Sequence, residues 1–226
     1  MRRIVLKISG KIIDHQKTDL IKRYGEVIRR IYESGDKIAV VTGGGEIARS
    51  YIRACRELTS NESFCDLMGI EISRINALLL AGVLEDLAYG RIPRDIDQFL
   101  EAWSTGRVVV LGGIQPGQST SAVAAAIAEL IRADFLIYLT IVRGVYDRDP
   151  SQPDAVLLRE VDIDMLENIL SKQSFVAGGY ELIDPVAIKI IKRSRINTFV
   201  TYGYDPENIM RILSGEIIGT RITYRL

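Results

Sequence analysis

Three consecutive glycines, Gly43, Gly44 and Gly45, lie between an apolar run and a stretch with helical character. The apolar run is 38–42, and the helical stretch begins at Glu46. Because glycine has no Cβ, the main chain here can approach a ligand closely. A helix start adds unpaired N–H groups and the positive end of the helix dipole. This order favours an anion site, most often one for phosphate, with an ordinary tight turn as the alternative.

Two other predicted strand ends carry related chemistry. Lys7 lies near the end of an apolar run and is followed by Gly10. An ammonium group is costly to bury unpaired, so Lys7 either points at a bound phosphate or extends along the strand edge to water. The segment 112–120 (GGIQPGQST) is a second loop of small residues that leads into an Ala-rich helix. Two anion sites at neighbouring strand ends suggest a donor and an acceptor phosphate.

Several other kinds of site are disfavoured. The glycine run lacks the Gly-Lys-Ser/Thr of a P-loop and the spacing of a dinucleotide fingerprint. Lys+Arg and Asp+Glu both number 29, so a general nucleic-acid binder is not expected. His15 is the single histidine and neither Cys55 nor Cys65 belongs to a CxxC pair, which argues against a zinc site. We expect both cysteines to be small buried apolar residues, with a disulfide as the minor alternative.

The compartment follows from the same sequence. The first residues lack the long apolar region and the cleavage site of a signal peptide. No apolar stretch approaches about 18 residues without interruption, so no membrane span is expected. We therefore expect a soluble protein in the reducing cytoplasm.

Short apolar runs alternate with segments of helical periodicity along the 226 residues. The expected strands are 3–8, 37–42, 107–111, 135–140, 198–202 and 219–224. The expected helices are 17–34, 46–58, 63–87, 95–105, 120–132, 162–170, 184–194 and 205–213. On the helix 46–58 we expect these residues to face inward: Ile47, Tyr51, Ala54, Cys55 and Leu58.

This alternation predicts an α/β protein. Near-continuous apolar strands are typical of a sheet that is covered on both faces, and the intervening helices imply parallel neighbours. We therefore predict a three-layer α/β/α sandwich with a central, mostly parallel sheet. Without a repeat or a linker, the chain is expected to form a single domain, 1–226, with two lobes of about 1–133 and 134–226. Ligands in such folds bind at the carboxyl ends of the strands.

Five segments, taken together, resemble a known family. They are 7–10 (KISG), 42–49 (TGGGEIAR), 112–120, 144–150 (GVYDRDP) and 184–189 (DPVAIK). In this order and spacing they resemble the amino-acid-kinase superfamily and, within it, the uridylate kinase family of archaea and bacteria. The resemblance spans essentially the whole chain. It implies an amino-acid-kinase-like fold that binds UMP in the first lobe and ATP in the second.

The resemblance also implies an activity and a set of residues. The implied reaction is phosphoryl transfer from ATP to UMP, with Mg²⁺, in pyrimidine nucleotide biosynthesis by a homohexamer built from dimers. Lys7 and Lys189 are the implied catalytic pair, and no protein metal ligand is assigned. The implied ATP contacts are Lys7, Ser9, Gly10, Gly45, Arg49, Thr140, Tyr146 and Asp149. The implied UMP contacts are Gly44, Asp66, Ile114, Gln115, Pro116, Gly117, Gln118, Ser119 and Thr120.

The sequence departs from the family pattern at three positions, and other readings stay open. Ile141 replaces a polar residue, Arg143 replaces an acid, and Ser121 stands where the superfamily often has an aspartate that organises the lysines. Another small-molecule kinase of the superfamily, or a non-catalytic nucleotide-binding subunit, is the alternative function. The helix 63–87 carries more apolar surface than one buried stripe requires, which favours oligomerisation over complete burial within a monomer.

Overall fold

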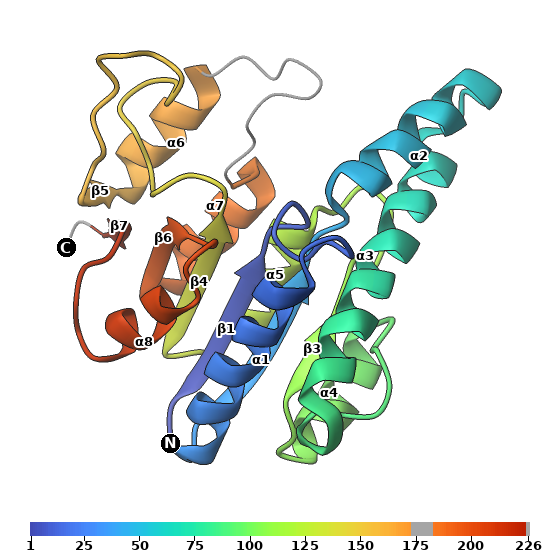
Figure 1. Cartoon of the computed structure of the whole chain (residues 1–226). Coiled ribbons are helices and arrows are strands. Elements are labelled where there is room, and N and C mark those ends of the chain that lie inside the picture. Colours follow the sequence, from blue (N-terminus) through green and yellow to red (C-terminus); the bar gives the residue numbers. More distant parts are fainter. Residues whose placement is uncertain (173–182, 225–226) are drawn as a thin grey trace.

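The computed structural model describes residues 1–172 and 183–224. Within these ranges one sheet has the strand order β3-β2-β1-β4-β6-β7-β5 (Figure 1). Its strands are β1 (Arg3–Ile8), β2 (Lys37–Thr42), β3 (Val109–Leu111), β4 (Phe135–Thr140), β5 (Glu160–Asp162), β6 (Thr198–Tyr202) and β7 (Thr220–Thr223). All neighbouring strands run parallel except β6 and β7. The predicted mostly parallel sheet is therefore confirmed, although β5 was not predicted.

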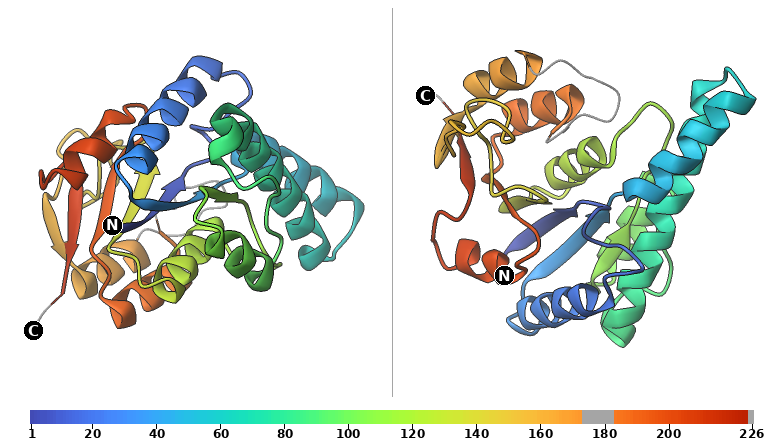
Figure 2. Two further views of the ribbon diagram at one scale, coloured as in Figure 1. Left: turned by 90° about the horizontal axis from the view of Figure 1, so that it is seen from below. Right: turned by 45° about the horizontal axis from the view of Figure 1, so that its top comes forward.

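Helices cover both faces of this sheet. They are α1 (Thr18–Glu33), α2 (Gly45–Leu58), α3 (Glu62–Leu84), the 3₁₀ turn η1 (Glu85–Leu87), α4 (Ile96–Ser104), α5 (Thr120–Leu130), α6 (Ile163–Lys172), α7 (Pro185–Ser194) and α8 (Glu207–Leu213). One apolar cluster joins the sheet to α1, α3 and α8, and a second joins it to α4, α5, α6 and α7. Figure 2 (left) shows α1 on one side of the sheet and α5 on the other. The three-layer α/β/α sandwich is confirmed.

The alternation of β1 fixes the direction of Lys7. Ile4, Leu6 and Ile8 pack in the cluster of α1 and α3, whereas Val5 packs in the cluster of α5 and α7. Successive side chains of a strand point to opposite faces, so Lys7 points to the same face as Val5, toward α5 and α7. A lysine at this position thus faces the side of the sheet on which the second candidate lysine is carried.

Two helices form an arm beside the sheet. α2 packs against α3, and both extend past the strands (Figure 1). Near the end of the arm Cys55 and Cys65 form a disulfide, with 5.5 Å between their Cα atoms. The expectation of unpaired cysteines was therefore wrong, because the turn between α2 and α3 brings the two helices together.

The arm also overturns the expected inward face of α2. Tyr51 is 56% exposed and Leu58 is 88% exposed, whereas Ala48 and Cys55 are buried. The expectation rested on the helical spacing of the apolar residues. Because α2 packs against α3, a narrower and differently placed stripe is covered.

No membrane span was expected from the sequence, but one described helical stretch has the length and hydropathy to cross a membrane. This stretch is Glu62–Leu87, with a mean hydropathy of 1.6 in its most apolar window. Core helices of soluble proteins pass the same test, and α3 contributes Ala77, Leu80 and Leu84 to the core.

The expected division of the chain into two lobes at about residue 133 stays a prediction. One sheet runs through both parts of the chain.

Candidate active site

The loops that follow β1 and β2 touch through bare backbone. A Cβ on Gly10 would collide with the amide nitrogen of Gly45 and would lie 2.5 Å from the carbonyl oxygen of Gly43. The Gly43 amide donates to the Ile8 carbonyl oxygen at 2.9 Å, which ties the two loops together. Gly45 has a φ of +69°, a conformation that favours glycine. The two glycine segments found in the sequence therefore form one contact, and no larger residue fits there.

The first turn of α2 opens onto this contact. Its N-cap is Gly44, and none of the described side chains caps it. Its free amide groups and the helix dipole therefore remain available for an anion. The buried Asn76 of α3 donates from Nδ2 to the Gly43 carbonyl oxygen at 2.8 Å and so holds the loop from behind.

Basic side chains surround the same helix start. Lys11 Nζ lies 3.0 Å from the Glu46 carboxylate, and Arg49 Nη1 lies 3.1 Å from it. The hydrogen bond from Lys11, together with the nearby charge of Arg49, lowers the pKa of Glu46. Arg49 is thus positioned one turn into α2, where a bound phosphate would compete with Glu46 for its guanidinium.

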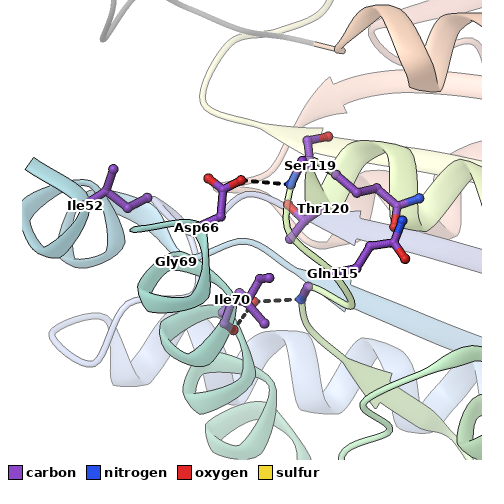
Figure 3. A pocket seen from close by; sticks show the side chains of 11 residues that line it. Ile52, Asp66, Gly69, Ile70, Gln115, Ser119 and Thr120 are labelled. Atoms are coloured by element: carbon purple, nitrogen blue, oxygen red, sulfur yellow. Dashed lines mark hydrogen bonds between the residues drawn. The ribbon is translucent and has the colours of Figure 1, made fainter. Parts of the chain in front are cut away.

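A cavity of about 260 Å³ lies between α2, α3 and the loop 112–119 (Figure 3). Six of the predicted UMP contacts line it: Asp66, Gln115, Gly117, Gln118, Ser119 and Thr120. Ile114 and Pro116 belong to the same loop but are not among the lining residues. Gly113 of the same loop also lines it. Four further lining residues carried no signal in the sequence: Ile52, Gly69, Ile70 and Ser73.

Side chains of α3 hold this loop. Asp66 Oδ2 accepts a hydrogen bond from the Gly117 amide at 2.8 Å, which leaves Oδ1 for a ligand (Figure 3). Ser73 Oγ accepts from the Gly113 amide at 2.7 Å. The Thr120 hydroxyl oxygen is 3.6 Å from the place that a Cβ on Gly43 would occupy. The loop and the glycine run therefore meet at the end of the cavity.

The N-termini of α5 and α7 are joined through their caps. Ser119 caps α5 by accepting from the amides of Ser121 and Ala122, and its hydroxyl donates to Asp184 Oδ2. The buried Asp184 in turn caps α7, because its Oδ1 accepts from the Val186 and Ala187 amides. This pair fixes the position of α7, the helix that carries Lys189, relative to the loop.

The two candidate lysines belong to different elements: Lys7 lies near the carboxyl end of β1, and Lys189 lies on α7. Lys7 is paired in register with Val41 of β2 and with Tyr138 of β4, whose hydroxyl donates to the Ser121 carbonyl oxygen at 3.1 Å. Burial, with the negative charge of Asp184, raises the pKa of Tyr138. Lys189 is exposed on α7, about 7.5 Å along the helix axis from its N-cap. Because α7 runs antiparallel to β6, its N-terminus lies at the carboxyl edge of the parallel strands.

Two of the predicted ATP contacts, Ser9 and Thr140, lie at the carboxyl ends of β1 and β4. The Ser9 amide donates to the Leu139 carbonyl oxygen at 3.0 Å, next to the end of β4. Thr140 ends β4, and its hydroxyl donates to the Val142 carbonyl oxygen at 3.0 Å. Asp149 Oδ1 accepts from the amide and the hydroxyl of Ser151, which lowers the pKa of Asp149. Tyr146 is half-buried in an isolated bridge with Leu157. Asp149 and Tyr146 thus have structural roles already, and their contact with a nucleotide stays a prediction.

Three polar residues that build the site were assigned no role from the sequence. Asn76 and Arg74 lie on α3 and bind loop carbonyl oxygens, and Asp184 joins two helix caps. Asp184 directly precedes a proline, which is a recognisable helix-start signal. For Asn76 and Arg74 the local sequence carries no such signal, because their partners lie more than 30 residues away in the chain.

Known proteins resemble this chain in sequence and in fold. The profile of the amino acid kinase family matches residues 2–202. The uridylate kinase of Hyperthermus butylicus is 47% identical over 97% of both chains, and that of Metallosphaera sedula is 48% identical over 95% of this chain and 96% of its own. The crystal structure of uridylate kinase from Archaeoglobus fulgidus matches with a TM-score of 0.89 at 39% identity, covering 99% of this chain and all of that one. The chain therefore belongs to the amino acid kinase family.

Proposed function

We propose that this protein transfers the γ-phosphoryl group of ATP to UMP and forms UDP and ADP. The observation that carries the proposal is the meeting of the two glycine loops with the loop 112–119 at the open N-terminus of α2. One cavity for an acceptor nucleotide thus ends at a site for phosphate. Similarity to uridylate kinases over nearly the whole chain supports the same reaction.

The chemistry of this reaction makes small demands on the protein. The nucleophile is an oxygen of the UMP phosphate, whose second pKa is about 6, so it is ionised near pH 7 without a general base. Catalysis then consists of alignment for in-line attack and stabilisation of the charge on the transferred group. The O–P bond to the acceptor forms while the bond between the γ-phosphorus and its bridging oxygen breaks, and the electron pair leaves with ADP.

We assign both requirements to residues of the glycine loops, the loop 112–119 and the two candidate lysines. In this proposal the Gly44 amide and Thr120 hold the UMP phosphate, and Asp66 accepts from the ribose hydroxyls through Oδ1. The Gly45 amide faces the γ-phosphate of ATP. Lys7, which points toward α5 and α7, and Lys189 on α7 neutralise the charge that passes between the β and γ phosphates. The Ser119–Asp184 pair keeps α7 in register with the acceptor loop.

ATP brings its Mg²⁺ to this site as part of the substrate. In residues 1–172 and 183–224, no group of three or more histidine, cysteine or acidic side chains is arranged to hold a metal ion. Mg²⁺ is commonly held by substrate phosphates and water with few protein ligands, which fits such a site. The proposed ATP contacts are those given by the resemblance, with Ser9, Gly10 and Thr140 placed at one edge of the sheet.

We also propose a homo-oligomer, a hexamer built from dimers, in the cytoplasm and in pyrimidine nucleotide biosynthesis. Large apolar side chains of α3 are exposed, including Phe64, Leu67, Ile75 and Leu78. Exposed patches of this kind are typical of protein interfaces. Light scattering coupled to gel filtration tests the assembly, and a monomer at micromolar concentration would contradict it.

A substrate panel tests the function. Release of ADP is measured with ATP and, in turn, UMP, CMP, carbamate and N-acetylglutamate. We expect turnover with UMP to exceed the others clearly. Turnover with carbamate or N-acetylglutamate alone would select another kinase of the family, and ATP binding without any transfer would select a non-catalytic subunit.

A further inference from the structure

Arg74 holds the start of the acceptor loop although it does not line the cavity. Its side chain is 12% exposed. Nε donates to the Gly113 carbonyl oxygen at 3.1 Å, and Nη2 donates to the Ile114 carbonyl oxygen at 3.3 Å. One guanidinium group thus binds two consecutive carbonyl oxygens of the loop.

The guanidinium group is itself held in place. Nη1 donates to Glu71 Oε1 at 2.7 Å, one turn earlier on α3. Nη2 also donates to the Arg94 carbonyl oxygen at 3.1 Å. All three nitrogens therefore have partners in a planar fork, an arrangement that a lysine ammonium cannot reproduce.

Arg74 and its neighbour on α3 fix both polar groups of one loop residue. Ser73 accepts from the amide of Gly113, and Arg74 donates to the carbonyl oxygen of the same residue. A Cβ at Gly113 would lie 3.0 Å from an Ile70 side-chain carbon, so the backbone also lies close against the helix. The direction in which the chain enters 115–120 is thus set at Gly113 and Ile114.

We propose that Arg74 is a positioning residue for the acceptor nucleotide. By fixing the Gly113 and Ile114 carbonyl oxygens, it places Gln115, Gln118 and Thr120 around the cavity and so sets the affinity for UMP. It does this without touching the nucleotide. The inference rests on the proposed function, because it assigns UMP to this cavity.

The test compares Arg74→Ala and Arg74→Lys with a matched control, Arg107→Ala. Arg107 also donates to two backbone carbonyl oxygens, those of Asp86 and Ala88, but it lies at the amino end of β3, away from the cavity. We expect Arg74→Ala to raise KM for UMP by about tenfold or more, the factor that corresponds to loss of about 1.4 kcal/mol. In Arg74→Ala the KM for ATP should change less than about twofold. Arg74→Lys should have a KM for UMP between those of Arg74→Ala and the wild type, and Arg107→Ala should leave both KM values unchanged.

Thermal unfolding of each variant separates positioning from general damage. A folded Arg74→Ala protein with an unchanged KM for UMP would overturn the inference, as would an equal rise in KM for ATP. If Arg74→Ala does not fold, Arg74→Lys decides by the same ratio of the two KM values. A wild-type protein that does not phosphorylate UMP would instead overturn the proposed function.

Discussion

Reduction of the Cys55–Cys65 disulfide is expected to lower the free energy of unfolding by about 2.7 kcal/mol. The bond closes a loop with a sequence separation of 10. In the chain-entropy relation such a loop removes about 9 cal/mol/K from the unfolded chain, which gives this value at 25 °C. For a chain of this length the melting temperature should fall by roughly 5–11 °C.

The assay is unfolding in guanidinium chloride with and without a thiol-free reductant, at one protein concentration. Thiols are first counted in the unfolded, unreduced protein, and we expect none to be free. The control is the double variant Cys55→Ala/Cys65→Ala, whose stability should not respond to the reductant. The reasoning is refuted if two free thiols are found, or if reduction changes the stability of the wild type by less than about 0.5 kcal/mol.

Three further outcomes are expected from single substitutions. Lys7→Ala should lower kcat by about a hundredfold or more, the range for loss of one donor to a developing charge, while Lys37→Ala at the opposite edge should not; equal kcat values would remove Lys7 from the mechanism. Gly10→Ala should destabilise the protein by about 1–3 kcal/mol or more in chemical denaturation, because its Cβ meets the backbone of the second glycine loop. Gly82→Ala on α3, where a Cβ meets nothing within 4 Å, serves as its control, and equal effects would contradict the contact. Asp36→Asn should lose about 1–2 kcal/mol at pH 7: burial raises the pKa of Asp36, but hydrogen bonds from Arg2 outweigh this and lower it. Because the pKa of Asp36 is lowered in the folded state, its contribution to stability is complete above the unfolded pKa of about 3.9 and is lost as the pH falls through the folded pKa. The difference in unfolding free energy between the wild type and Asp36→Asn should therefore narrow below about pH 4; a constant difference would contradict this assignment.

Much of the fold could be predicted because buried parallel strands have a strong sequence signal. The runs at Phe135–Thr140 and Lys37–Thr42 were predicted with their observed bounds, since each is apolar along nearly its whole length. β5 could not be recognised, because it has only three residues, Glu160–Asp162, and exposes the first of them. Its strand character comes from pairing with β7.

The arm shows where periodicity fails. The predicted inward face of α2 included Tyr51 and Leu58, because both fit the helical spacing of its apolar residues. Here α2 packs on α3, and the disulfide follows from that turn. A pattern within one helix cannot show which neighbour covers it.

The loops of the candidate site could be predicted from the sequence, whereas the side chains that hold these loops in place could not. Parallel strands place Gly10, Gly45 and Thr120 at one edge, so their meeting follows from the fold. The partners of Arg74 and Asn76 are backbone carbonyl oxygens far along the chain, which no spacing reveals.

The most direct test of the account is a crystal structure with UMP and a non-hydrolysable ATP analogue. We predict that the UMP phosphate lies within hydrogen-bond distance of the Gly44 amide and faces the γ-phosphate, which the Gly45 amide contacts. The ammonium groups of Lys7 and Lys189 should bind phosphate oxygens at the junction of the two nucleotides. A UMP phosphate bound away from the start of α2, or two ammonium groups on opposite sides of the nucleotides, would contradict it.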